Sequence, residues 1–257
     1  MTSHDTWFRC AEPRPAAALR LVCFPHAGGA ASFYGSWSRS LPSSVELLAV
    51  QYPGREDRIR DDRVHDMGKL ADLVAEALEP LCAGRPISLL GHSMGAGVAY
   101  EVACRLERRG RTPARLFVSG RPAPDRQRRK AVHRASDEDL LTELRRLAPA
   151  NHALADHPEL AELMLPTVRD DFRLIESYEP CGSVLDCPVT AMLGDHDTEV
   201  TVEEAQGWRA FTRGRFTMKV FPGDHFYLIP RRAQLIDWVL RSLDGVAAPP
   251  RAWPSTP

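Results

Sequence analysis

Short apolar runs alternate along most of the chain with longer segments whose apolar residues recur at helical spacing. The apolar runs predict strands at 20–25, 45–52, 86–90, 115–120, 188–194 and 215–221. The intervening segments predict helices at 67–82, 94–109, 201–211 and 230–243, and a short amphipathic piece at 32–41. Strands that alternate with helices are typical of a doubly wound, mostly parallel sheet. The pattern therefore predicts an α/β fold.

The alternation is interrupted at 121–186, which contains no convincing core strand. This insertion predicts helices at 136–147, 158–165 and 166–178, the last two separated at Pro166. Ligands of such folds bind outside the carboxyl ends of the strands. A helical insertion that leaves a strand at that edge is expected to lie over the site as a lid. We thus expect one domain over 1–246 with this lid insertion, followed by a disordered tail at 247–257.

Composition and charge narrow the class of protein. The 257 residues are 44% hydrophobic and 26% charged, and the net charge is −1, which gives no indication of a nucleic-acid or anionic-membrane partner. No segment reaches the ~20 apolar residues that a membrane span needs, and the polar N-terminus does not resemble a secretory signal. The six cysteines have no C-x-x-C spacing. Reduced thiols in a cytoplasmic protein are favoured, and we expect a monomer.

The clearest chemical motif is Gly91-His92-Ser93-Met94-Gly95, a G-x-S-x-G sequence. It lies between a predicted strand and a predicted helix that begins with small residues. This context indicates a nucleophile elbow, in which a strained turn exposes a serine. The two glycines are expected because strand and helix crowd together there. Ser93 is the predicted nucleophile, and a structural glycine turn is the alternative.

A serine hydroxyl needs a base to take its proton, and the base needs a carboxylate to fix its tautomer. In elbow folds the acid and then the histidine follow the serine in the chain. His225 comes directly after the last predicted strand, in a glycine-containing turn, and is the predicted base. The preceding strand is followed by Asp195, Asp197 and Glu199, each of which could be the acid.

Preorganised N–H donors should bind the oxyanion of the tetrahedral intermediate. The backbone of Met94, directly after the nucleophile, should supply one donor. The loop His26-Ala27-Gly28-Gly29 stands where lipases have an HGGG sequence. From this loop we choose Ala27 as the second donor, with Gly28 as the alternative. No strong metal-ligand spacing, P-loop or dinucleotide fingerprint is present, so we expect neither a metal nor a cofactor.

Five segments are together more specific than the elbow alone. They are Cys23-Phe24-Pro25-His26-Ala27-Gly28-Gly29, Gln51-Tyr52-Pro53-Gly54-Arg55, Gly91-His92-Ser93-Met94-Gly95-Ala96, Asp171-Phe172-Arg173 and Phe221-Pro222-Gly223-Asp224-His225-Phe226. With them the chain, from about Trp7 to Leu243, resembles the type II thioesterases of polyketide and nonribosomal peptide synthesis. The resemblance implies an α/β-hydrolase fold, and the family's G-x-x-D spacing favours Asp197 as the acid. The sequence departs from the family at Thr198, where proline commonly follows the catalytic aspartate.

The resemblance also implies a function. Such enzymes are freestanding editing hydrolases that remove stalled or aberrant acyl groups from the phosphopantetheine arm of acyl or peptidyl carrier proteins, by a Ser-His-Asp mechanism through an acyl-enzyme. A medium-chain fatty acyl thioesterase or an oxoester hydrolase is the alternative on the same scaffold. An acyl-carrier-binding protein on an inactive hydrolase fold is the non-enzymatic alternative.

Two groups of residues in the insertion bear on the substrate. The carrier proteins of such systems are generally acidic, so the basic residues Arg128, Arg129 and Lys130 are predicted to steer docking; a solvated loop is an equally good interpretation. The apolar residues could line an acyl pocket or pack the lid, and the sequence does not divide them. These are Leu140, Leu141, Leu144, Leu163, Met164, Phe172 and Ile175.

Overall fold

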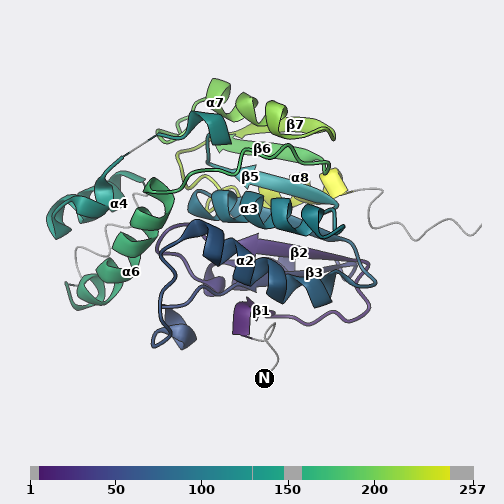
Figure 1. Ribbon diagram of the computed structural model, residues 1–257, viewed down its shortest axis with the longest axis horizontal. Coiled ribbons are helices and arrows are strands. Elements are labelled where there is room, and N and C mark those ends of the chain that lie inside the picture. The colour runs from purple at the N-terminus through teal and green to yellow at the C-terminus, as the bar shows by residue number, and fades with distance from the viewer. Residues whose placement is uncertain (1–5, 129, 148–157, 244–257) are drawn as a thin grey trace, which may run out of the picture.

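A sheet of seven strands in the order β1-β3-β2-β4-β5-β6-β7 forms the centre of the computed structural model, which describes residues 6–128, 130–147 and 158–243 (Figure 1). The strands are β1 (Phe8–Arg9), β2 (Leu19–Phe24), β3 (Val45–Val50), β4 (Ile87–His92), β5 (Arg115–Ser119), β6 (Val189–Gly194) and β7 (Phe216–Phe221). Neighbouring strands are parallel except β1, which is antiparallel to β3. The predicted α/β class with a mostly parallel sheet is confirmed.

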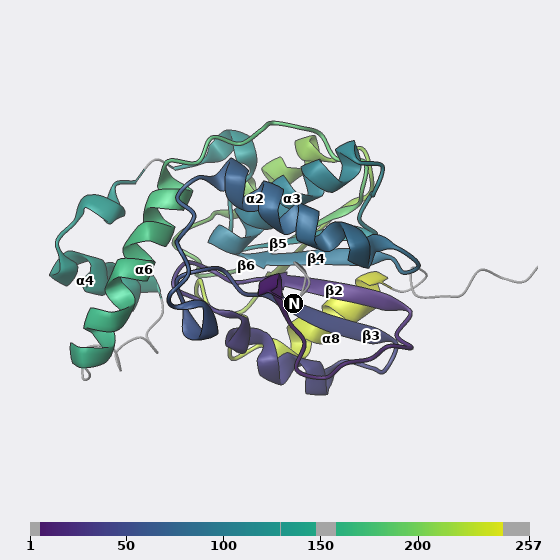
Figure 2. The same ribbon diagram turned by 60° about the horizontal axis from the view of Figure 1, so that its bottom comes forward.

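Helices cover both faces of the sheet. The α-helices are α2 (Met67–Leu78), α3 (Met94–Arg108), α4 (Asp137–Leu147), α6 (Pro158–Glu176), α7 (Val202–Gln206) and α8 (Arg232–Leu243). The 3₁₀ segments are η1 (Ala31–Ser40), η2 (Glu56–Arg58), η3 (Glu79–Cys82), η4 (Pro124–Arg126), η5 (Val132–Arg134) and η7 (Gly207–Phe211). Helices α2 and α3 pack on one face, and α8 lies on the other with η1 (Figure 2).

The strand period of two explains this division of the core. Successive side chains of a strand point to opposite faces, so Leu89 packs in the cluster beneath α2 and α3 whereas Leu90 packs in the cluster with α8. Both leucines are almost completely buried. The central strands read as continuous apolar runs because both of their faces are covered.

The insertion between β5 and β6 lies beyond one end of the sheet, where α4 and α6 pack together. Its small core consists of Leu140, Leu144, Leu165 and Val168. The predicted break at Pro166 is wrong, because α6 runs through this proline. Proline leaves the carbonyl of residue i−4 without its helical donor. Here that residue is Glu162, which is exposed like Pro166, so water can reach the carbonyl.

Both ends of the insertion are fixed to the body of the molecule. At its start, Trp208 donates an indole N–H hydrogen bond of 2.9 Å to the carbonyl oxygen of Arg121. At its end, the buried carboxylate of Glu101 on α3 accepts hydrogen bonds from the Tyr178 hydroxyl at 2.7 Å and the Cys181 amide at 2.9 Å. The helix that follows Ser93 therefore also holds the returning chain.

The N-terminal segment adds a strand that the sequence pattern did not predict. Phe8 and Arg9 form β1 on Val50 and Ala49 of β3, and Trp7 and Phe8 are buried in the core. The predicted disordered tail at 247–257 lies outside the described residues. All six cysteines are present as free thiols. None of the described helices is long and apolar enough to cross a bilayer.

Candidate active site

Ser93 occupies the turn between β4 and α3, in the strand–turn–helix context that the motif predicts. Its backbone angles are φ 54° and ψ −117°, a combination that costs a non-glycine residue free energy and is found mainly at functional sites. The turn is held by a hydrogen bond of 2.8 Å from the Ser93 amide to the carbonyl of Ser119 on β5. The surrounding sheet thus stabilises a strained backbone that presents the serine hydroxyl.

The two glycines of the motif have the predicted steric role. A Cβ added at Gly91 would lie 2.1 Å from the carbonyl oxygen of Gly95. One added at Gly95 would lie 2.1 Å from the carbonyl oxygen of Phe24 on β2. Both contacts are with backbone atoms that the sheet and α3 hold in place. The elbow can therefore form only if both positions lack a side chain.

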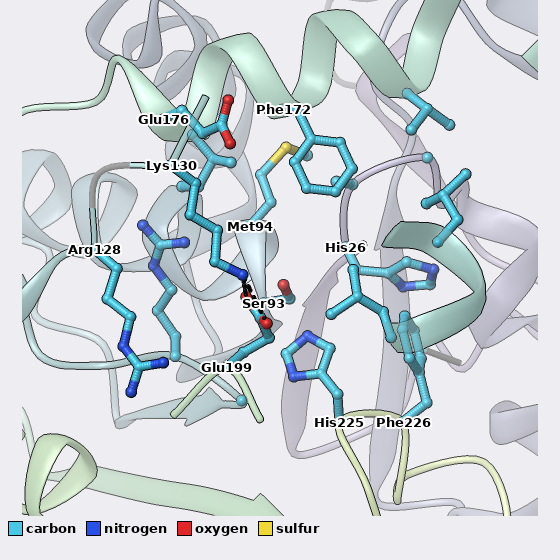
Figure 3. A pocket seen from close by; sticks show the side chains of 18 of the residues that line it. His26, Ser93, Met94, Arg128, Lys130, Phe172, Glu176, Glu199, His225 and Phe226 are labelled. Carbon is cyan, nitrogen blue, oxygen red and sulfur yellow. Dashed lines mark hydrogen bonds and ion pairs between the residues drawn. The ribbon is translucent and has the colours of Figure 1, made fainter. Parts of the chain in front are cut away.

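His225 follows β7 and is held by Asp197, which follows β6. The Nδ1 atom of His225 lies 3.0 Å from each carboxylate oxygen of Asp197, and the two side chains are 2% and 0% exposed. Asp197 also accepts a 2.8 Å hydrogen bond from the Glu199 amide. A carboxylate at Nδ1 favours the tautomer with its proton there, which leaves the Nε2 lone pair available. Ser93 and His225 line the same pocket (Figure 3).

The other two carboxylates that the sequence left open have different partners. Asp195 is exposed and accepts a 2.8 Å hydrogen bond from the amide of Gly223. Glu199 forms an ion pair of 2.8 Å with Lys130 and a second one with Arg146. Of the three carboxylates, Asp197 is the one that the structure brings to the imidazole.

The loop after β2 and the start of α3 supply backbone amides beside Ser93. Ala27, Gly28 and Met94 all line the pocket. The Gly28 amide donates a 2.7 Å hydrogen bond to the carboxylate of Asp171 on α6, so this N–H is already engaged. Met94 is the first residue of α3, where backbone N–H groups have no partner within the helix. This arrangement favours the amides of Ala27 and Met94 as the oxyanion donors.

Two further histidines lie near His225 and are uncharged at neutral pH. The ring of His92 is fully buried, and burial together with the neighbouring His225 holds its pKa well below the usual value. The His26 ring lies edge-on to Phe33 and Phe226, and desolvation lowers its pKa to about 3. Neither ring therefore adds a positive charge that would oppose protonation of His225.

A buried hydroxyl chain behind these rings was not predicted. The Ser119 hydroxyl lies 2.9 Å from Nδ1 of His92 and 2.7 Å from the hydroxyl of Tyr227. Tyr227 follows His225 by two residues, and Ser119 ends β5. A serine at the carboxyl end of a central strand is the sequence signal that could have drawn attention to this chain.

Helices α4 and α6 of the insertion supply an apolar wall of the pocket, and Phe172 projects from α6 across from Ser93 (Figure 3). Leu144, Met164 and Ile175 also line this wall. Leu140 is instead fully buried in the insertion's own core, and Leu141 packs against it. Leu163 is 62% exposed. The structure thus divides the apolar residues into pocket, core and surface positions.

A second wall of the pocket, from the part of the insertion between β5 and α4, is polar and includes two of the predicted docking cations. Arg128 pairs with Glu204 at 2.6 Å, and Lys130 pairs with Glu143 at 3.2 Å as well as with Glu199. Both cations line the pocket. The third, Arg129, lies outside the described residues. Among the residues that the structure describes, no group of three or more His, Cys, Asp or Glu side chains could hold a metal ion.

Known proteins resemble this chain in both sequence and structure. Residues 19–243 match the thioesterase domain family. The probable cadicidin biosynthesis thioesterase of Streptomyces griseus is 42% identical over 99% of this chain and 70% of its own length. Thioesterase PikA5 of Streptomyces venezuelae is 42% identical over 86% of this chain and 80% of its own length.

Solved structures agree with these relatives. The type II thioesterase BorB from the borrelidin biosynthetic cluster has a TM-score of 0.87 at 41% identity, covering 93% of this chain and 98% of that chain. The RedJ thioesterase from the prodiginine pathway of Streptomyces coelicolor has a TM-score of 0.82 at 40% identity, covering 88% of this chain and 86% of that chain.

The fold and the elbow define an α/β-hydrolase, and the chain belongs to the thioesterase family within that fold. It is a serine thioesterase, an enzyme that hydrolyses thioesters. The resemblance to type II thioesterases that the sequence motifs predicted is confirmed.

Proposed function

We propose that this thioesterase removes stalled or aberrant acyl groups from the phosphopantetheine arm of acyl or peptidyl carrier proteins. The observation that carries the proposal is the convergence of Ser93 and the Asp197-held ring of His225 in one pocket with an apolar wall. The relatives named for antibiotic biosynthesis support this substrate class. A cytoplasmic location, where such synthases work, belongs to the same proposal.

The reaction proceeds in two halves. In the first, the Ser93 hydroxyl attacks the thioester carbonyl carbon while Nε2 of His225 takes its proton, and Asp197 stabilises the imidazolium. The amides of Ala27 and Met94 donate to the oxyanion. The carbon–sulfur bond then breaks, and the thiol leaves with the proton from His225. In the second half, His225 activates water, which hydrolyses the acyl-Ser93 ester and regenerates the serine.

The two walls of the pocket suggest how an acyl-carrier substrate lies. The acyl chain lies against the apolar residues of α4 and α6, among them Leu144 and Phe172. Each methylene buried there contributes only about 1–3 kcal/mol of discrimination, which suits an enzyme that accepts several aberrant groups. The polar wall with Arg128 and Lys130 faces the carrier, although the carboxylates paired with these cations reduce their net charge.

A panel of acyl-carrier proteins with different acyl groups tests the proposed substrate. Release of the free acid should be catalytic for the wild-type enzyme and absent for Ser93→Ala. A matched set of small thioesters and oxoesters distinguishes the alternatives. Turnover of small esters without turnover of any loaded carrier protein would refute the proposal and favour a medium-chain acyl thioesterase or an oxoester hydrolase.

The docking role of the cations has its own test. Charge reversal at Arg128 and Lys130 should raise KM for the acyl-carrier protein more than KM for a small thioester, and added salt should weaken the effect. Equal effects on both substrates would rule out docking by these residues. Arg145, a half-buried residue of α4 that does not line the pocket, provides a matched charge reversal.

A further inference from the structure

Two charged residues from the segments that mark the family, Arg55 and Asp171, have no role in the reaction just described, yet they meet in the structure. Arg55 ends the Tyr-Pro-Gly-Arg segment, and Asp171 begins the Asp-Phe-Arg segment on α6, 116 positions later. The Nη1 and Nη2 atoms of Arg55 each lie 2.8 Å from a different carboxylate oxygen of Asp171. The side chains of this bidentate pair are 9% and 7% exposed.

The pair also holds the glycine-rich loop beside Ser93. Asp171 accepts the Gly28 amide hydrogen bond at 2.7 Å, and Arg55 donates a 2.8 Å hydrogen bond to the carbonyl of Gly29. The loop lies directly against α6, because a Cβ added at Gly28 would come within 2.8 Å of Val168. These contacts fix the peptide groups that follow Ala27.

A contribution to stability alone does not account for such a pair. Moving both charges out of water costs several kcal/mol, and an apolar pair of the same volume is often as stable. The benefit of charge at this position is directional, since the carboxylate aligns one peptide N–H and the guanidinium aligns one carbonyl.

We propose that Arg55 and Asp171 are positioning residues that set the loop so that the Ala27 amide points at the oxyanion. Because Asp171 belongs to α6, the oxyanion hole is complete only when this helix of the insertion is in place. The inference rests on the proposed mechanism at Ser93 and does not depend on which acyl carrier is the substrate.

The neighbouring residue on α6 offers a matched control. Asp170 pairs with Arg63 at 2.6 Å and, like Asp171, joins α6 to the segment after β3. No contact of Asp170 with the 26–29 loop occurs among the described hydrogen bonds and ion pairs. Asp171→Asn and Asp170→Asn therefore each remove one charge from the same helix and weaken one link to the body, but only the first alters the glycine-rich loop.

The test compares hydrolysis of a small acyl thioester with the binding of two inhibitors. An acyl trifluoromethyl ketone adds to Ser93 and forms an oxyanion, whereas the corresponding amide binds only as a ground-state analogue. For Asp171→Asn we expect kcat to fall about 100- to 1000-fold, KM to change little and the ketone Ki to rise by a similar factor as kcat falls. The Ki of the amide should stay near the wild-type value. Asp170→Asn should remain within a few-fold of wild type throughout.

Several outcomes would overturn the inference. They are a folded Asp171→Asn variant with wild-type kcat and ketone binding, an equal loss for ketone and amide, or equal losses in both variants. If Asp171→Asn does not fold, Arg55→Lys is measured in its place, because it keeps the charge but cannot form both contacts. The same selective loss of ketone affinity is then expected, and an unselective loss would refute it. Turnover of the loaded carrier protein by the wild-type enzyme is scored separately, so failure of the proposed substrate is recognised independently.

Discussion

The low pKa of His26 predicts a loss of stability in mild acid. An unfolded chain protonates this ring near the ordinary pKa of about 6.5, whereas the folded protein leaves it neutral down to about pH 3 because the ring is desolvated beside His225 and Arg55. Below pH 6.5 the unfolded state therefore binds more protons, and the free energy of unfolding decreases as the pH decreases. The stabilising contribution is complete above pH 6.5 and declines as the pH falls toward 3.

The size of the effect follows from this difference in proton binding. At pH 5 protonation favours the unfolded chain by about 2 kcal/mol for a fully desolvated ring, and at pH 7 by about 0.2 kcal/mol. One edge of His26 faces the pocket, so water there reduces the change to about 1–2 kcal/mol between pH 7 and pH 5. The pKa of His92 is shifted in the same direction. Because a comparison of wild type with a His26 variant leaves His92 in both proteins, its contribution cancels in the difference.

Urea unfolding at constant ionic strength, followed by tryptophan fluorescence, measures the effect. His26→Phe keeps an aromatic ring between Phe33 and Phe226 but cannot titrate, so this variant should lose about 1–2 kcal/mol less than wild type between pH 7 and pH 5. Equal losses for His26→Phe and wild type would refute the interpretation that His26 stays neutral.

Three further predictions concern the elbow, the acid and the insertion. Gly95→Ala should abolish soluble folding because its Cβ would meet a β2 carbonyl at 2.1 Å, whereas Gly35→Ala, with open space around it, should give normal yield and melting temperature. Asp197→Asn should lower kcat about 10³- to 10⁴-fold with little change in KM; steady-state kinetics with near wild-type kcat would contradict the proposed triad. Leu140→Ala truncates a fully buried side chain and should destabilise the small core of the insertion by about 2–5 kcal/mol. Amide hydrogen exchange should therefore accelerate in α4 but not in the sheet.

The sequence predicted the sheet well because its central strands are buried on both faces and flanked by strongly periodic helices. It missed β1, since the pairing of Phe8 with Val50 depends on contacts between distant residues. The break expected at Pro166 failed because Glu162, whose carbonyl the proline leaves without a helical donor, is an exposed residue. Local pattern carries no information on either point.

In the candidate site, too, residues marked by a local motif were predicted, whereas contacts between distant segments were not. Ser93 and His225 were identified because each follows a strand in a recognisable turn. Asp195, Asp197 and Glu199 share one short loop, and only the path of the turn decides which carboxylate reaches the imidazole. The Arg55 contact to α6 was beyond prediction for a similar reason, because its two halves come from distant parts of the chain.

The anchoring of the insertion at both ends has a consequence for engineering. Trp208 holds the start of the insertion at Arg121, and Glu101 holds its end at Tyr178 and Cys181. The insertion is therefore a cassette that can be exchanged between two fixed attachment points. Chimaeras that receive this cassette from a relative, with the acidic pair at 170–171 retained, should inherit the donor's acyl-length preference while the chemistry stays that of the host.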